Sequence, residues 1–231
     1  MREYCKIHSL YKRSPNGKEM LFGQYSLPEF EYLKNNQWVF TEKIDGTNIR
    51  IAWDADTQQV QFGGRTDNAS IPAPLISRLN ELFNTTEAKE KFKSKFTVPV
   101  TLYGEGYGAK IQKSGGLYKP DGQDFVLFDV MIGENFLPQH DVFGLAALFE
   151  IKQAPVVGIG TLSDLENKVN GHFVSAWGDF NAEGIVARPA IELRTRNGSR
   201  VITKLKIRDF EQPRKEDQHG SENIESASTT S

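Results

Sequence analysis

Residues 38–53 constrain the fold of this chain more than any other stretch. An apolar run, Trp38-Val39-Phe40, precedes Lys43-Ile44-Asp45-Gly46, and an alternating run from Ile49 to Trp53 follows. Runs of this kind are typical of β-strands, and Asp-Gly is a common turn dipeptide. The stretch therefore predicts a strand, a tight hairpin turn and a second strand, with Lys43 at the mouth of the turn.

Similar strand patterns return along the chain and alternate with stretches of helical spacing. We expect strands over residues 60–62, 98–103, 125–132, 183–188 and 200–207, and helices over 27–33, 74–95, 141–150 and 163–169. Ser163 and Glu166 are spaced as a capping box for the last helix, and Ser14 to Gly17 is a turn signal. These patterns predict one mixed α+β domain over residues 1–210. Residues 211–231 are almost entirely polar and are expected to form a disordered tail.

Composition excludes several classes of protein. The net charge is -2, so any binding of nucleic acid needs a local basic face. Cys5 is the sole cysteine, which excludes an intrachain disulfide, and the scattered histidines have no zinc-ligand spacing. The N-terminus lacks an apolar signal core, and no run approaches the roughly 18 apolar residues of a membrane span. We expect a soluble, cytoplasmic protein that does not bind membranes.

Charged residues stand within or beside several of the expected strands, where a charge is costly unless it is paired. They are Lys43, Arg65, Glu105, Asp129, Glu183, Lys204 and Lys206. Each also has a structural explanation. Arg65 could cap a turn, Asp129 could pair with a neighbouring strand, and the last two lysines could share a solvated strand face.

Taken together and in order, these residues resemble the successive motifs of the covalent nucleotidyltransferases, which include ATP-dependent ligases and mRNA capping enzymes. The motifs are Lys43-Ile44-Asp45-Gly46, Gly64-Arg65, Glu105-Gly106, Phe128-Asp129, Glu183-Gly184-Ile185-Val186 and Lys204-Leu205-Lys206. The stretch from Glu42 to Asn48 is most similar to the RNA ligase 2 group. The resemblance spans residues 42–206 and implies a nucleotidyltransferase domain of the ATP-grasp-like ligase adenylation type, with mainly antiparallel sheets flanked by helices.

The resemblance implies that Lys43 is a covalent nucleophile that takes AMP from ATP. An amine attacks phosphorus only after it loses its proton, so it needs burial or neighbouring cations that favour its neutral form. Lys204 and Lys206 would supply those cations and stabilise charge on the α-phosphate. Glu183 would bind Mg²⁺ (or Mn²⁺), directly or through water.

The same resemblance implies roles for the remaining residues of the nucleotide site. Glu105 would accept hydrogen bonds from ribose hydroxyls, and Phe128 would stack on adenine, although nearby Phe125 is an alternative. Glu42 and Asn48 would flank the nucleotide. Arg65 would contact a phosphate or the strand that carries the 3′-hydroxyl. The glycine-rich basic loop over residues 110–116 could cradle phosphates or be a solvated hairpin tip, and the sequence leaves both open.

The resulting functional hypothesis is an ATP-dependent RNA ligase that forms lysyl-AMP and joins 5′-phosphate to 3′-hydroxyl ends. Its expected partner is nucleic acid with such ends, RNA favoured. A minimal DNA ligase is the nearest alternative and a capping guanylyltransferase is less favoured. A non-catalytic nucleic-acid-binding module of the same fold is the alternative from another class. Few residues follow Lys206, where such enzymes usually carry a further C-terminal domain. This leaves three interpretations open: a minimal ligase, a truncated chain, or a chain that works with a partner subunit in place of that domain.

Overall fold

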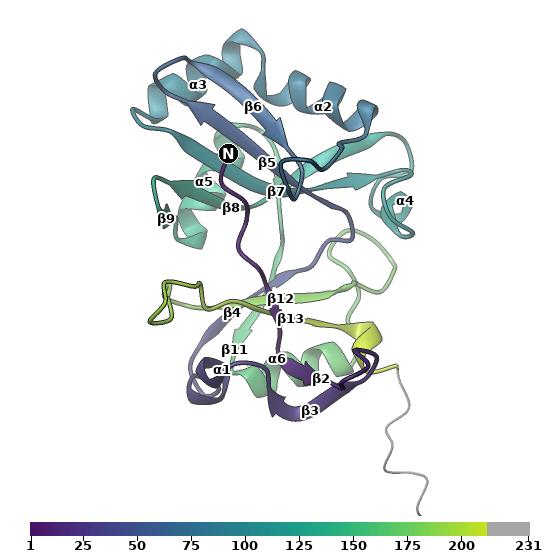
Figure 1. Cartoon of the computed structure of the whole chain (residues 1–231). Coiled ribbons are helices and arrows are strands. Elements are labelled where there is room, and N and C mark those ends of the chain that lie inside the picture. Colours follow the sequence, from purple (N-terminus) through teal and green to yellow (C-terminus); the bar gives the residue numbers. More distant parts are fainter. Residues whose placement is uncertain (212–231) are drawn as a thin grey trace, which may run out of the picture.

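The computed structural model describes residues 1–211, which form two β-sheets that lie one above the other in Figure 1. We call them the lower and the upper sheet. Mainly antiparallel sheets with flanking helices confirm the predicted α+β class. The expected tail over residues 211–231 lies, apart from Glu211, outside the described residues, and the domain boundary remains a prediction.

The lower sheet has the strand order β1-β13-β12-β4-β11, and all its neighbours are antiparallel except β1 and β13. Its strands are β1 (His8–Ser9), β4 (Trp38–Glu42), β11 (Val156–Gly160), β12 (Gly184–Pro189) and β13 (Thr203–Lys206). A separate hairpin of β2 (Tyr11–Arg13) and β3 (Met20–Tyr25) lies beside it. Strands from both ends of the chain therefore meet in this sheet.

The upper sheet has the strand order β10-β8-β7-β5-β6, and β9 also pairs with β8. Its strands are β5 (Thr47–Asp54), β6 (Gln59–Gly63), β7 (Val100–Gly108), β8 (Gln123–Ile132), β9 (Asn135–Phe136) and β10 (Lys152–Gln153). All pairs are antiparallel except β10 with β8. β7 and β8 are the two longest strands of this sheet and pair with each other along most of their length.

Two larger hydrophobic cores and a third, smaller cluster around Tyr118 are closed by helices that pack on the sheets (Figure 1). The helices are α1 (Pro28–Tyr32), α2 (Ala73–Phe83), α3 (Thr86–Lys95), α4 (Gly115–Tyr118), α5 (Gln139–Leu148), α6 (Leu162–Asn170) and the 3-10 helix η1 (Ile207–Asp209). In the upper core Trp53 stacks on Phe92, with 5.1 Å between ring centroids. In the lower core Leu165 of α6 packs with Trp38 of β4. Within residues 1–211 no helix has the length and apolarity needed to cross a membrane.

The predicted hairpin around Lys43 is wrong. β4 pairs with β11 and β12 in the lower sheet, whereas β5 pairs with β6 and β7 in the upper sheet. The segment 43–46 is therefore a crossover between the sheets, visible in Figure 1 as the link that rises from β4 to β5. A local turn signal says where the chain bends, but the pairing partners come from distant sequence.

Two helix predictions also need correction. The single helix expected over residues 74–95 is two helices, because Thr85 caps α3 by accepting a hydrogen bond from the Ala88 backbone N–H at 3.2 Å. The capping box of α6 is formed by Thr161 and Asp164 rather than by Ser163 and Glu166. Glu166 instead accepts a hydrogen bond from the Tyr11 hydroxyl at 2.5 Å.

The N-terminal segment spans both sheets. The Met1 carbonyl accepts a hydrogen bond from Arg50 and the Arg2 carbonyl accepts one from Tyr103, both residues of the upper sheet. The segment then descends to β1, which pairs with β13 (Figure 1). Residues 1–9 consequently connect the two sheets at the edge of the space between them.

Candidate active site

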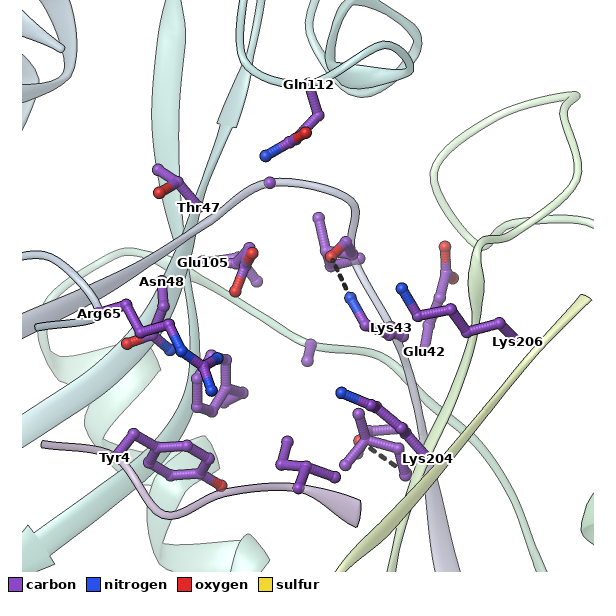
Figure 2. Close-up of a pocket in the computed structure, with 18 of the residues that line it drawn as sticks. Tyr4, Glu42, Lys43, Thr47, Asn48, Arg65, Glu105, Gln112, Lys204 and Lys206 are labelled. Atoms are coloured by element: carbon purple, nitrogen blue, oxygen red, sulfur yellow. Dashed lines mark hydrogen bonds between the residues drawn. The ribbon is translucent and has the colours of Figure 1, made fainter. Parts of the chain in front are cut away.

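A cavity of about 380 Å³ lies between the two sheets and gathers most of the predicted site residues. Figure 2 shows Lys43, Asn48, Arg65, Glu105, Lys204 and Lys206 around this common space. Eight of the nine predicted residues line it, namely Glu42, Lys43, Asn48, Arg65, Glu105, Phe128, Lys204 and Lys206. The ninth, Glu183, reaches the same place through its ion pairs. Residues far apart in sequence therefore form one pocket.

Glu183 bridges two of the three lysines. Its carboxylate accepts hydrogen bonds from Lys43 Nζ at 2.6 Å and from Lys206 Nζ at 2.5 Å. The register of β12 and β13 explains this, because Gly184 is paired with Lys206. Among the described residues Lys204 has no ion-pair partner, and it projects into the pocket from the same strand face (Figure 2). Burial lowers the pKa of Lys204, and the nearby charges of Lys206 and Lys43 lower it further.

Glu42 is held by the segment that precedes Glu183. One carboxylate oxygen accepts the Ser175 hydroxyl at 2.5 Å, and the other accepts the Ala176 backbone N–H at 2.9 Å. Burial raises the pKa of Glu42, whereas these two donors favour its charged form. The 171–183 segment thus fixes the carboxylate of the residue that precedes Lys43 in the chain.

Glu105 of β7 and Asn48 of β5 are paired neighbours and form the wall that the upper sheet gives to the pocket, on the left in Figure 2. Burial raises the pKa of Glu105 to about 8; the Lys43 charge opposes this rise and the Glu183 charge adds to it. The Asn48 side-chain oxygen is buried and has no hydrogen-bond partner in the described part of the chain. Both groups are available to a ligand.

Replacing Glu105 with glutamine should remove a pH dependence from folding stability. A carboxyl whose pKa is raised in the folded chain contributes stability below its ordinary value of 4.5, and this is lost as the pH rises through about 8. The difference in melting temperature, Glu105→Gln minus wild type, should therefore increase between pH 5 and pH 9. Each kcal/mol of change in the free energy of unfolding corresponds to about 2–4 °C. Thermal unfolding at both pH values measures this difference. Glu90 is exposed, so the melting temperature of Glu90→Gln should change with pH as that of wild type does. The same result for Glu105→Gln would contradict the raised pKa of Glu105.

Phe128, rather than Phe125, faces the pocket. Phe128 lines the cavity, while Phe125 is 1% exposed and belongs to the upper core. Tyr4 lies against the edge of Phe128, with 5.1 Å between centroids and an interplanar angle of 68°. These two rings give the pocket an aromatic end, and Figure 2 shows Tyr4 across the pocket from the lysines.

Several pocket residues were missed by the sequence interpretation. Tyr4, Gln112 and Arg188 line the cavity. Tyr4 belongs to the N-terminal segment, which precedes the motifs over residues 42–206 and has little periodicity of its own. Gln112 belongs to the loop whose role the sequence left open, and its positive φ of 53° marks an unusual backbone geometry there.

Asp129 does not line the pocket. It is fully buried beneath it and pairs with Arg188, Nη1 to Oδ1 at 3.1 Å, and with Arg200. Tyr4 donates its hydroxyl proton to the same carboxylate at 2.6 Å. Burial alone would raise the pKa of Asp129, but the two guanidinium groups hold it below its usual range. Asp129 is therefore paired, but not with a neighbouring strand as its structural explanation expected, because Arg188 belongs to β12 of the lower sheet and Arg200 precedes β13.

No three His, Cys, Asp or Glu side chains converge as a metal site within residues 1–211. The oxygen donors near the lysines include the carboxylates of Glu183 and Glu105 and the unpartnered oxygen of Asn48. A hard cation such as Mg²⁺ keeps several waters and commonly takes one or two carboxylates plus substrate phosphates. This donor set fits a cation held mainly by water and phosphate.

Gly46 is needed where the crossover passes β7. A Cβ at this position would lie 2.2 Å from the Gly106 carbonyl oxygen and 2.7 Å from Cγ of Glu105. Gly46→Ala should therefore lower the free energy of unfolding by about 1–3 kcal/mol, the usual cost of overpacking. Denaturant titration measures this loss. Gly116→Ala, where a Cβ meets nothing within 4 Å, is the control, and equal stability of the two variants would contradict the prediction.

The RNA ligase family model matches residues 36–206 of this chain. The chain belongs to the RNA ligase family. Its fold is similar to solved structures of a Naegleria gruberi RNA ligase. One, a mutant with ATP and Mn, has a TM-score of 0.60 and 18% identity over 90% of this chain and 58% of that one. Another, with PPi, has a TM-score of 0.61 and 18% identity over 90% and 59%. The chain thus spans less than two thirds of those proteins.

Proposed function

We propose that this chain is the nucleotidyltransferase part of an ATP-dependent RNA ligase, with Lys43 as the residue that becomes adenylated. The observation that carries the proposal is the convergence of Lys43, Lys204 and Lys206 on one pocket, together with Glu183. A binding module has no need for a nucleophile surrounded by cations. Membership of the RNA ligase family supports the same conclusion.

In the first step, the lone pair of Lys43 Nζ attacks the α-phosphorus of ATP. A P–N bond forms, the bond from the α-phosphorus to the bridging oxygen breaks, and pyrophosphate leaves with the electron pair while the amine gives up a proton. Lys204 and Lys206 line the same pocket as Lys43, and as preorganised cations they would stabilise the negative charge that develops on the α-phosphate. Their low exposure strengthens this effect.

The pocket's opposite end suits the nucleoside. Phe128 and Tyr4 offer aromatic surface for adenine, and Glu105 offers acceptors for ribose hydroxyls. When bound, a divalent cation would neutralise phosphate oxygens, and Glu183 and Asn48 are the residues best placed to hold it or its water. Structures of the Naegleria gruberi RNA ligase with ATP and Mn, and with AMP and Mn, support a nucleotide and a divalent cation in this fold.

In the next steps, AMP would pass from Lys43 to a 5′-phosphate, and a 3′-hydroxyl would displace it to join the strands. Arg65 lines the pocket beside the ribose end and is the candidate contact for a phosphate or for the acceptor strand. RNA is the favoured substrate because the matching family is that of RNA ligases. A DNA ligase would share the pocket and the chemistry.

Labelling tests this proposal. The protein is incubated with α-labelled ATP or GTP and Mg²⁺, denatured and assayed for acid-labile label, which should come from ATP alone. Sealing is then compared on nicked RNA, RNA/DNA hybrid and DNA duplexes, with nicked RNA expected to be joined fastest. Label from GTP would support a capping enzyme, and preferential sealing of DNA would support a DNA ligase. Absence of label together with intact RNA binding would support a non-catalytic binding module.

A further inference from the structure

A second cavity, of about 940 Å³, adjoins the nucleotide pocket on the side of β13. It lies between the turn of the β2–β3 hairpin and η1, which are neighbours at the lower right of Figure 1. Arg13, Lys18 and Arg208 line it with both β13 lysines, alongside the acidic residues Glu19, Asp209 and Glu211. We call this cavity the β13 groove.

The β13 groove begins at the reactive centre. Lys204 and Lys206 line both cavities, whereas Lys43 lines the nucleotide pocket and not the groove. In phosphoryl transfer the attacking and leaving groups lie roughly in line across the phosphorus. The group on the other side of the phosphorus from Lys43 therefore lies toward Lys204 and Lys206, where the groove begins.

The structure fixes the shape of the groove. Arg13 Nη2 is 2.7 Å from Asp209 Oδ1, and the other oxygen of Asp209 accepts the Lys206 backbone N–H at 3.0 Å. The hairpin turn is closed by a hydrogen bond from the Ser14 N–H to the Glu19 carbonyl, and Asn16 accepts the Lys18 N–H at 2.9 Å. The turn signal in the sequence thus positions Lys18 beside the end of β13.

Two cations of the groove are free to take a ligand. Lys18 and Arg208 are exposed and have no ion-pair partner among the described residues. Together with Lys204 they form a cationic path that leads away from the nucleotide pocket. Cations spaced along a groove are the usual means of holding a phosphodiester backbone, while the overall charge of -2 makes this local face notable.

We propose that the β13 groove binds the donor strand, the RNA strand whose 5′-phosphate receives AMP, through phosphate contacts from Lys18 and Arg208. The inference rests on the proposed ligase function. The groove, at about 940 Å³, is larger than the 380 Å³ pocket that would hold a whole nucleotide, so it has room for more than one nucleotide and for more than pyrophosphate. Pyrophosphate as its main occupant is the alternative that the test must separate.

The test compares the double variant Lys18→Ala/Arg208→Ala with wild type. Binding of a 5′-phosphorylated RNA oligonucleotide is measured by fluorescence anisotropy over a range of salt concentrations, without ATP. The affinity should fall about tenfold at low salt. The slope of log K against log salt should become less steep by about 1.4, because two phosphate contacts are removed and each contributes about 0.7 on a single strand. Transfer of AMP from preloaded protein to this RNA should slow to a similar degree at subsaturating RNA, whereas adenylation by ATP should not change.

Lys93→Ala/Lys95→Ala on α3 removes two exposed cations from the opposite end of the molecule and is the matched control. Unchanged RNA affinity and salt slope in the groove variant would overturn the proposal. An equal slowing of adenylation and of pyrophosphate-driven release of AMP would overturn it in favour of pyrophosphate. Absence of label on wild-type protein would reject the ligase function, and the binding experiment would still decide what the groove holds.

Discussion

Lys43→Arg is expected to abolish formation of the covalent nucleotide adduct while leaving the pocket intact. Arginine keeps the positive charge and can still pair with Glu183, which now accepts a hydrogen bond from Lys43 at 2.6 Å. A guanidinium stays protonated in proteins, so it has no lone pair with which to attack phosphorus. Loss of a nucleophile costs several orders of magnitude, and we expect label incorporation from ATP to fall by roughly a thousandfold or more.

A second substrate separates the nucleophile from the rest of the site. A strand that already carries 5′-adenylate bypasses the lysine, so Lys43→Arg should still join it to a 3′-hydroxyl. Lys204→Arg retains the nucleophile and a cation, and should keep measurable labelling. If Lys43→Arg were labelled like wild type, another residue would be the nucleophile. If it also failed on adenylated strands while remaining folded, Lys43 would act in strand joining as well.

Local patterns predicted strands better than they predicted connections. The apolar run over 125–132 and the alternating run after Thr47 are strands because their side chains fit a pleated, half-buried surface. Nothing local indicated that β4 and β5 belong to different sheets. That outcome depends on β11 and β12, which come more than a hundred residues after β4 and supply its neighbours. Non-local pairing is the information that a turn signal lacks.

The helical spacing over residues 74–95 correctly predicts helix, but it does not predict the break between α2 and α3. Apolar residues on α2 and α3 enter the same core, so the spacing continues across Asn84 and Thr85. The signal was the threonine, whose side chain competes for backbone N–H groups and favours an N-cap over a helix interior. In α6 the correct cap, Thr161, lies only two residues before the expected one.

The site residues could be predicted because charged side chains within strands are unusual and therefore informative. Lys204 and Lys206 alternate with buried Leu205, so period two alone places both on one face. Which other elements meet that face depends on tertiary structure. Tyr4 reaches the pocket because the N-terminal segment bonds to the upper sheet and continues into β1, which pairs with β13 of the lower sheet. No pattern in residues 1–7 predicts this. The sequence likewise did not predict that Lys18 and Arg208 line one groove, because only the fold brings the hairpin turn next to η1.

Asp129→Asn is expected to cause the largest loss of stability. The side chains of Asp129 and its partners Arg188 and Arg200 are 0%, 7% and 2% exposed, and the carboxylate supplies the charge that balances both guanidinium groups. Arg200 also pairs with Glu192, but Arg188 would be left with the carbonyl of Phe128. Breaking a buried ion pair from one side costs about 3–5 kcal/mol because the remaining charge is uncompensated.

Thermal and denaturant unfolding of Asp129→Asn measure this loss, which corresponds to about 2–4 °C in melting temperature for each kcal/mol. Glu31→Gln breaks the exposed pair with Lys34 and should cost less than about 1 kcal/mol. Because Tyr4 donates to Asp129 and Phe128 precedes it in β8, the variant should also raise the KM for ATP in adenylation at temperatures where it is folded. A stability loss as small as that of Glu31→Gln would mean that the two arginines find other partners. A large loss of stability with an unchanged KM would mean that the buried cluster holds the sheets together without setting the aromatic end of the pocket.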